Sequence, residues 1–156
     1  MAKSVERFTQ TFGSMLRVTA RIKSQFSNYQ GVDFTGLRLL SHLKTSGPSR
    51  LSDLAEVLQV DPALITRQSH VLVDGGFAKR AINPADARGT LLEISESGIQ
   101  LFANHCEVRN EFFENVFSDW SQDEINQFES SLERFTKALN EKSAAAMSQH
   151  KQKQER

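Results

Sequence analysis

Apolar residues recur every three or four positions along most of the chain, which is the period of an amphipathic helix. A first stripe runs from Val5 to Phe26, and a second helix is predicted from Phe34 to a stop at Gly47-Pro48. Two further stripes, from Ile99 to Val116 and from Ile125 to Leu139, predict two long helices near the end. The inner face of the second helix is expected to carry Phe34, Leu37, Leu40 and Leu43.

Two short helices are predicted in the middle of the chain, joined by a tight turn at residues 59–61. Ser49 can cap the first of them. Asp61 can cap the second, with Pro62 at the first helical position, where its missing N–H costs nothing. That second helix should end at Gly75-Gly76, because glycine permits a left-handed closing residue.

After this point the period changes to that of strands. Residues 77–82 and 90–94 predict two short strands, separated by a turn-rich loop over 83–89. Ser95 can cap the following helix, and Ser121 with Glu124 forms a capping box before the last one. The fold class is therefore mainly α with a small β-hairpin wing, a winged helix-turn-helix.

The second short helix is narrow enough to enter a DNA major groove. Its positions divide into two sides, one with Ile65, Gln68, Ser69 and Leu72, and one with Ala63, Thr66, Arg67, His70 and Asp74. The second side suits base edges and phosphates, since Arg reads guanine and Thr or Ala can contact a thymine methyl. An ordinary solvated helix face is the alternative interpretation, which the adjoining hairpin disfavours.

Basic side chains also mark the hairpin. Lys79 and Arg80 lie on its first strand, and Arg88 lies near its tip, where an arginine can read a narrow minor groove. Asp86 is close enough in sequence to hold the Arg88 guanidinium, although a simple surface ion pair is also consistent. The expected DNA-binding residues are Arg50, Pro62, Ala63, Thr66, Arg67, His70, Lys79, Arg80, Asp86 and Arg88.

The net charge of zero hides an uneven distribution of charge. Residues 1–92 carry 12 Lys and Arg against 7 Asp and Glu, whereas residues 93–156 carry 7 against 12. A basic first part suits a phosphate-bearing partner such as double-stranded DNA. An imbalance of this size can also arise by chance, so it only supports the motif.

Composition excludes several classes of protein. No apolar run approaches the roughly 18 residues of a membrane span, and no signal peptide is seen at the start. The single Cys106 allows no internal disulfide, which fits a reducing cytoplasm, and it is expected to be a small apolar residue rather than a redox sensor. Phosphate loops, nucleophile elbows and metal-ligand spacings are missing, so we expect no enzyme activity, cofactor or metal.

The residues of the central segment resemble the MarR family of transcriptional regulators. Leu51–Val60 is similar to the family's scaffold helix, and Ile65-Thr66-Arg67 with Leu72 and Gly76-Phe77 is similar to its recognition helix. Arg80, Asn83–Arg88 and Leu92–Gly98 are similar to its wing with the Asp-x-Arg element. The resemblance extends over residues 5–145 in element order and is most specific over 51–98.

The resemblance implies a homodimeric repressor of a pseudo-palindromic promoter site, released by a small aromatic or phenolic ligand. It implies DNA contacts for Arg67 and Arg88 and a wing clamp for Asp86. Residues 1–30 and 96–146 would form a helical dimerisation region, 31–95 the DNA-binding domain, and 147–156 a frayed tail. Asp61 departs from the polar cap of many members, and its charge would repel phosphate.

The residues themselves also favour a dimer. The terminal helices carry long apolar stripes that a small DNA-reading unit does not need, with Phe8, Phe12, Phe26, Phe128 and Phe135 among them. An intramolecular bundle is the alternative. The phenylalanines fit a core better than a ligand pocket. The competing function is a winged protein–protein interaction module that does not read DNA, against which the basic residues of the motif speak.

Overall fold

The computed structural model describes residues 2–25, 28–83 and 86–154, and the side chains of residues 4–23, 28–83 and 90–143. Phe26, which the sequence pattern places in the first helix, lies outside the described residues. The chain divides into two compact units between Val108 and Arg109. Each unit is described by itself below.

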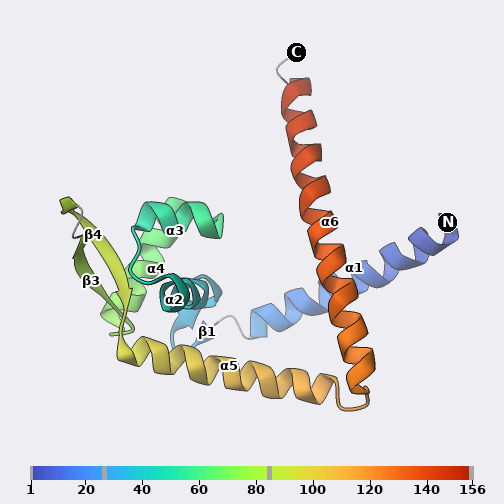
Figure 1. Cartoon of the computed structure of the whole chain (residues 1–156), viewed down its shortest axis with the longest axis horizontal. Helices are drawn as coiled ribbons and strands as arrows, with labels where there is room; N and C mark the ends of the chain where they lie inside the picture. Colours follow the sequence, from blue (N-terminus) through green and yellow to red (C-terminus); the bar gives the residue numbers. More distant parts are fainter. Residues whose placement is uncertain (1, 26–27, 84–85, 155–156) are drawn as a thin grey trace. The chain divides into compact units, whose positions relative to one another are not determined.

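The described residues of the first unit form the helices α1 to α4, the first part of α5 and two small antiparallel hairpins (Figure 1). Its elements are α1 (Ala2–Gln25), β1 (Asn28–Tyr29), β2 (Val32–Asp33), α2 (Phe34–Ser46), α3 (Leu51–Leu58), α4 (Pro62–Asp74), β3 (Ala78–Asn83), β4 (Asp86–Ile94) and α5 (Glu96–Val116), whose last turns belong to the second unit. The predicted order of helices and wing is confirmed. The hairpin β1–β2 was not predicted from the sequence.

That first hairpin closes through a turn at Gln30 and Gly31, both of which have positive φ. The Gly31 N–H donates a 2.6 Å hydrogen bond to Asn28 Oδ1, so the asparagine side chain holds the turn together. Two residues on each side are too few to show strand alternation, which explains why the sequence pattern indicates only an interruption.

The core of the first unit forms around α2 and includes α3, α4, the base of the wing and the start of α5. Its buried apolar residues are Val32, Leu37, Leu39, Leu40, Leu43, Leu54, Ala55, Ile65, Leu72, Ala78, Leu92 and Leu101. The prediction that Phe34 belongs to this inner face is wrong, because its side chain is 47% exposed. Leu39 is buried instead, since α2 is covered on several sides and a one-sided stripe underestimates its contact surface.

The start of α3 differs from the prediction that Ser49 caps it. Arg50 occupies the cap position and makes no side-chain capping bond. Ser49 instead pairs with Leu92 of the wing, its N–H donating to Leu92 O at 3.0 Å and its carbonyl accepting from Leu92 N at 2.9 Å. Because this pairing holds Ser49 in an extended conformation, its hydroxyl donates backwards to Gly47 O.

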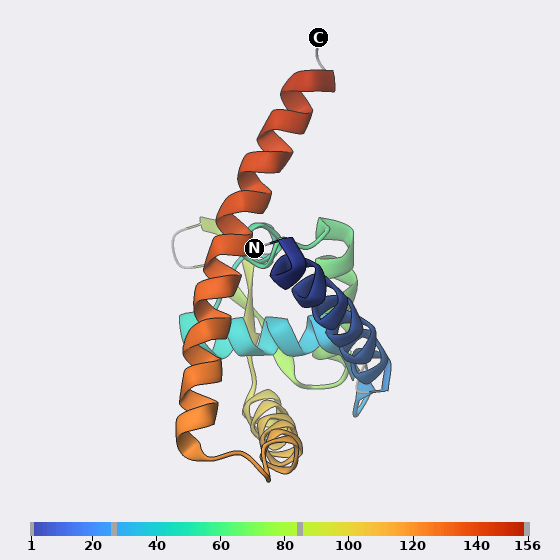
Figure 2. The ribbon, with the colours of Figure 1, turned by 90° about the vertical axis from the view of Figure 1, so that its right-hand side faces the viewer.

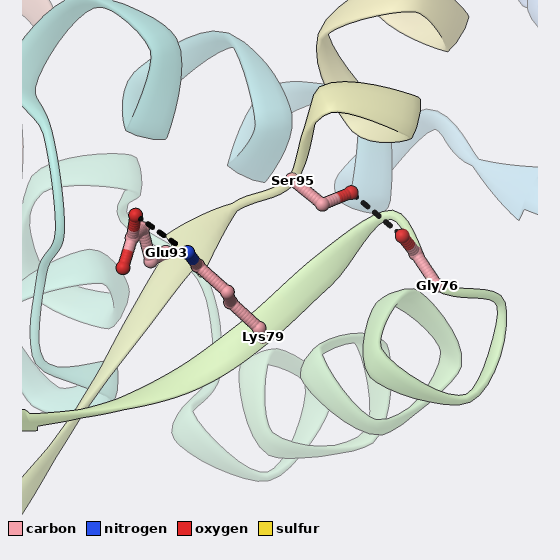
Figure 3. A network of polar contacts seen from close by, with 4 residues as sticks. All are labelled: Gly76, Lys79, Glu93 and Ser95. Atoms are coloured by element: carbon pink, nitrogen blue, oxygen red, sulfur yellow. Dashed lines mark hydrogen bonds and ion pairs between the residues drawn. The ribbon is translucent and has the colours of Figure 1, made fainter.

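Ser95 joins the wing, the end of α4 and the start of α5 (Figure 3). Its Oγ accepts a hydrogen bond from Gly98 N at 3.1 Å, which confirms the predicted cap. The same hydroxyl donates to Gly76 O at 2.6 Å, and Ser95 N donates to Phe77 O at 3.1 Å. Gly76 has a φ of 74°, the left-handed conformation expected where α4 ends.

The second unit consists of the end of α5 and the long helix α6 (Gln122–Gln154), which Figure 2 shows as one continuous rod. The predicted capping box is confirmed: Ser121 N donates to Glu124 Oε2 at 2.8 Å, and Glu124 N donates to Ser121 Oγ at 3.3 Å. The backbone N–H and hydroxyl of Ser121 lower the pKa of the Glu124 carboxyl below its ordinary value. Glu124 therefore stays ionised, and can accept both bonds, at lower pH than an unpaired glutamate.

The backbone of α6 remains helical to Gln154, beyond residue 146, after which the sequence predicts a frayed tail. Residues 147–154 are mainly Gln and Lys, both good helix formers, with no Gly or Pro among them. The helix therefore continues without an apolar stripe.

Candidate nucleic-acid interface

Helix α4 presents two chemically different faces, as the sequence predicts. Ile65, Gln68, Ser69 and Leu72 are buried, whereas Ala63, Thr66, Arg67 and His70 are exposed. The burial confirms which residues share a face, although a role in DNA binding is a separate prediction. Of the expected contact residues, these four and Pro62, also exposed, lie together on the first turns of one helix.

Asp61 holds the first turn of α4. Its Oδ1 accepts hydrogen bonds from Ala63 N at 2.8 Å and Leu64 N at 3.3 Å. Thr66 Oγ1 donates to Pro62 O at 2.9 Å, which leaves the exposed hydroxyl free to act as an acceptor. The helix start is therefore ordered before any ligand arrives, with the Asp61 carboxylate next to the face that would meet phosphates.

Replacing Asp61 with alanine should lower the free energy of unfolding by about 1 kcal/mol, because two N–H groups lose their acceptor. Asp61→Ser provides the matched control, since serine caps nearly as well without a charge. Urea unfolding should show a clear loss for alanine and little for serine. Equal losses for the two variants would mean that the carboxylate charge, rather than the cap, stabilises this helix.

The wing carries a cross-strand ion pair that the sequence analysis missed. Lys79 and Glu93 face each other in the β3–β4 register, and Lys79 Nζ lies 3.1 Å from Glu93 Oε1 (Figure 3). The Lys79 side chain is 61% exposed, so the pair contributes little to stability. Glu93 nevertheless neutralises part of the positive charge that Lys79 is expected to present to DNA. Predicting this pair requires the strand register. The sequence does not specify that register, because the length of the turn-rich loop is uncertain.

Arg50 and Arg80 line one groove between the start of α3 and the wing. The groove has a volume of about 260 Å³, and its other lining residues are Leu51, Ser52, Thr90, Leu91 and Leu92. The Ser49–Leu92 pairing creates it by holding the start of α3 against β4. Two exposed arginines from distant parts of the sequence thus lie on the same surface. Ser52 and Thr90 add hydroxyl groups that the sequence analysis did not single out.

The expected Asp86–Arg88 clamp lies where side chains are outside the described residues. The backbone shows that β4 begins at Asp86, so residues predicted as loop are part of the strand. A register shift next to Asn83 allows it to pair with Asp86 and lengthens the hairpin. The clamp itself remains a prediction.

Two negative findings apply to the described part of the chain. Within it, no three His, Cys, Asp or Glu side chains come close enough together to hold a metal ion. None of the described helices has a segment both apolar and long enough to cross a membrane.

Comparison with known proteins places the chain in a family. The MarR family model matches residues 35–90. The "Uncharacterized HTH-type transcriptional regulator YxaD" of Bacillus subtilis is 33% identical over 101 residues, which cover 65% of this chain and 71% of YxaD. Mb0904 of Mycobacterium bovis, also named an HTH-type transcriptional regulator, is 35% identical over 81 residues, or 52% of this chain and 57% of that protein.

Solved structures agree with this assignment at the level of the fold. A MarR family protein from Bacillus stearothermophilus superposes with a TM-score of 0.72 at 19% identity, covering 86% of this chain and 97% of the other. A mutant of MarR from E. coli, solved in complex with operator DNA, gives a TM-score of 0.63 at 22% identity, covering 80% and 93%. With its winged helix-turn-helix and its relatives among HTH-type regulators, the chain belongs to the MarR family of transcriptional regulators.

Proposed function

We propose that the protein is a homodimeric repressor that binds a pseudo-palindromic site in double-stranded DNA. The observation that carries this proposal is the exposed face of α4, on which Thr66, Arg67 and His70 lie opposite a fully separate buried face. An α-helix fits the major groove, and arginine and threonine are suited to base edges. A structural neighbour, a mutant of MarR from E. coli, was solved in complex with operator DNA, which supports DNA as the partner.

The groove between α3 and the wing would lie along the phosphate backbone. Arg50 and Arg80 both line it, and the exposed start of α3 adds backbone N–H groups near the end of a helix dipole. Contacts of this kind set the register of a protein on DNA without reading its sequence. We assign base reading to α4 and positioning to the groove and wing.

A second copy of the chain is the proposed partner of the long helices. Large apolar side chains of α1 and α6 are between 41% and 56% exposed, namely Val5, Phe8, Met15, Leu16 and Val18 of α1 and Phe128, Leu132 and Leu139 of α6. Extended apolar surfaces of this kind mark interaction sites. A two-fold dimer would also present two copies of α4 to DNA, about 34–36 Å apart for one turn of the duplex.

Replacing Leu132 with glutamate should dissociate this dimer, because a charge would be buried in the apolar stripe. Sedimentation equilibrium should show a fall from twice the chain mass of 17.6 kDa to that of a single chain. Gln127→Glu introduces the same charge at an exposed polar position of α6 and should leave the mass unchanged. A wild-type protein that sediments as a monomer would contradict the dimer.

We propose that a small aromatic acid releases the repressor. Cationic and aromatic side chains meet in the first unit: the Lys23 ammonium lies 4.7 Å from the Phe34 ring centroid, and the Lys44 ammonium lies 5.6 Å from that of Phe102. Such groups can bind an aromatic ring and a carboxylate together. Unchanged DNA affinity across a panel of phenolic and aromatic acids would contradict this part of the proposal.

The test of DNA binding is a salt titration with the duplex upstream of the protein's own gene, against an unrelated duplex of equal length. The logarithm of the binding constant should fall linearly with the logarithm of the salt concentration, with a slope of about −0.9 per phosphate neutralised. The affinity should be higher for the upstream duplex. Arg88→Ala should reduce the slope by about one. Weak, equal binding to both duplexes would contradict a sequence-specific regulator and favour the interaction module.

A further inference from the structure

A hydrogen bond links the buried face of α4 to the start of α2. Gln68 Nε2 donates to Asp33 Oδ2 at 2.8 Å. The other carboxylate oxygen, Asp33 Oδ1, accepts from Gly36 N at 2.8 Å and caps α2. One aspartate at the end of the β1–β2 hairpin therefore contacts two helices, one of them the helix that carries Arg67 on its opposite face.

The glutamine stands at a tightly packed position. Its side chain is only 8% exposed, and Oε1 is buried without a hydrogen-bond partner among the residues that the structure describes. A Cβ added at Gly36 would lie 3.3 Å from this oxygen and 2.6 Å from Val32 Cγ1, so α2 and α4 approach closely here. The amide cannot turn over to satisfy Oε1, because that oxygen would then face the Asp33 carboxylate.

Stability alone does not account for a glutamine at this position. An unpaired buried acceptor is destabilising. With an unbranched apolar side chain of similar length the buried Oε1 would be gone, and the acceptor that loses its donor would be Asp33 Oδ2, on a residue that is only half-buried. A hydrogen bond, unlike an apolar contact, has a required direction. The bond to Asp33 therefore restricts how α4 can rotate about its own axis.

A second polar contact from α2 holds the other helix of the motif. Arg38 Nη2 donates to Leu58 O at 2.7 Å, satisfying a carbonyl at the end of α3. The segment from Asp33 to Arg38 thus contacts both α3 and α4. Of these two contacts, only the Asp33–Gln68 bond reaches the middle of the DNA-reading helix.

We propose that Gln68 is a positioning residue: its hydrogen bond to Asp33 sets the rotational orientation of α4, and with it the direction in which Thr66, Arg67 and His70 face the DNA. This inference rests on the proposed function for its effect on sequence preference. The orientation of α4 itself can be measured without DNA, so the two can fail separately.

Three variants test the inference. Gln68→Met removes the bond and the unpaired acceptor at nearly constant shape, and Gln68→Glu places two carboxylates against each other. In the double variant with Asp33→Asn and Gln68→Glu the polarity is reversed: the introduced asparagine still caps α2 through its Oδ1, while its Nδ2 donates to the new carboxylate. Thr45→Ala is the control, because that exposed hydroxyl donates to the carbonyls of Ser41 and His42, within α2 itself.

Each variant is measured in the intact protein in three ways: by urea unfolding, by residual dipolar couplings of the N–H bonds of α4 relative to α2, and by the ratio of affinities for the upstream and unrelated duplexes. Gln68→Met should unfold at the same urea concentration as the wild type, but the couplings of α4 should change and the affinity ratio should fall about tenfold. Gln68→Glu should change the couplings and the affinity ratio in the same way. The reversed pair should restore couplings and ratio to within about twofold of the wild type.

Unchanged α4 couplings in Gln68→Met would overturn the inference, as would a reversed pair as defective as the single variants. A loss of urea resistance with couplings and ratio intact would show a merely structural role and also overturn it. If the wild-type protein prefers neither duplex, the proposed function fails. In that case the α4 couplings alone decide the inference. The inference is supported if Gln68→Met changes these couplings and the reversed pair restores them.

Discussion

Replacing Arg67 with alanine is expected to reduce affinity for the preferred duplex by about tenfold to a hundredfold, while affinity for unrelated DNA changes much less. Arg67 lies on the exposed face of α4, one helical turn from the capped start. A guanidinium there can make two hydrogen bonds to the edge of a guanine, an interaction that no other side chain reproduces with the same geometry.

Two controls separate base reading from charge. Arg67→Lys keeps the charge but loses the two-pronged geometry, so it should lose sequence preference while retaining most non-specific affinity. Arg109→Ala removes an equal charge from an exposed position of α5, outside the candidate interface, and should leave the preference intact. Equilibrium binding to both duplexes at one salt concentration measures these effects. A preference for the upstream duplex that survives in Arg67→Ala would exclude Arg67 as a reader of bases.

Gly98→Ala should lower the free energy of unfolding by about 3 kcal/mol or more, because among the glycines whose surroundings the structure describes Gly98 has the closest backbone neighbour. A Cβ at this position would run into the carbonyl oxygen and carbon of Phe77 and lie 3.0 Å from Ile94 Cγ1. The Phe77 carbonyl is backbone and already accepts from Ser95 N, so it cannot move aside without breaking the junction between α4, the wing and α5.

Gly13→Ala is the matched control for this substitution. A Cβ at Gly13 would meet only the Arg17 guanidinium, at 3.7 Å, in the interior of α1. Alanine is the better helix former there, so the control should be neutral or should raise stability by up to about 1 kcal/mol. Urea unfolding of both variants measures the difference. A Gly98→Ala protein as stable as Gly13→Ala would show that α5 is free to shift away from Phe77.

The sequence predicts helix α4 well because its signals are local. Asp61-Pro62 specifies how α4 begins, Gly76 allows the left-handed residue after its end, and helical periodicity separates its two faces. All three depend on residues within the same short segment. The order of helices and wing follows from the same kind of signal.

The features that the sequence does not predict are tertiary. Ser49 has the composition of a helix cap but pairs with Leu92, more than forty positions away. Periodicity identifies Gln68 as buried but gives no reason to connect it with Asp33, a residue of an unrecognised hairpin. Lys79 has the charge of a DNA contact, yet its partner Glu93 is fixed by strand register. The tertiary fold brings such partners together, and a pattern of residues along the chain carries no information about these distant contacts.

The pairing of Ser49 with Leu92 restricts where insertions and deletions can be tolerated as this sequence diverges. A residue gained or lost in β4 between Leu92 and Ser95 would shift either the anchor of α3 or the cap of α5, because both are fixed to backbone atoms of that short stretch. Changes in length at the distal end of the wing would disturb neither anchor. Evolution can therefore alter the length of the wing while its attachment to α3 and α5 stays unchanged.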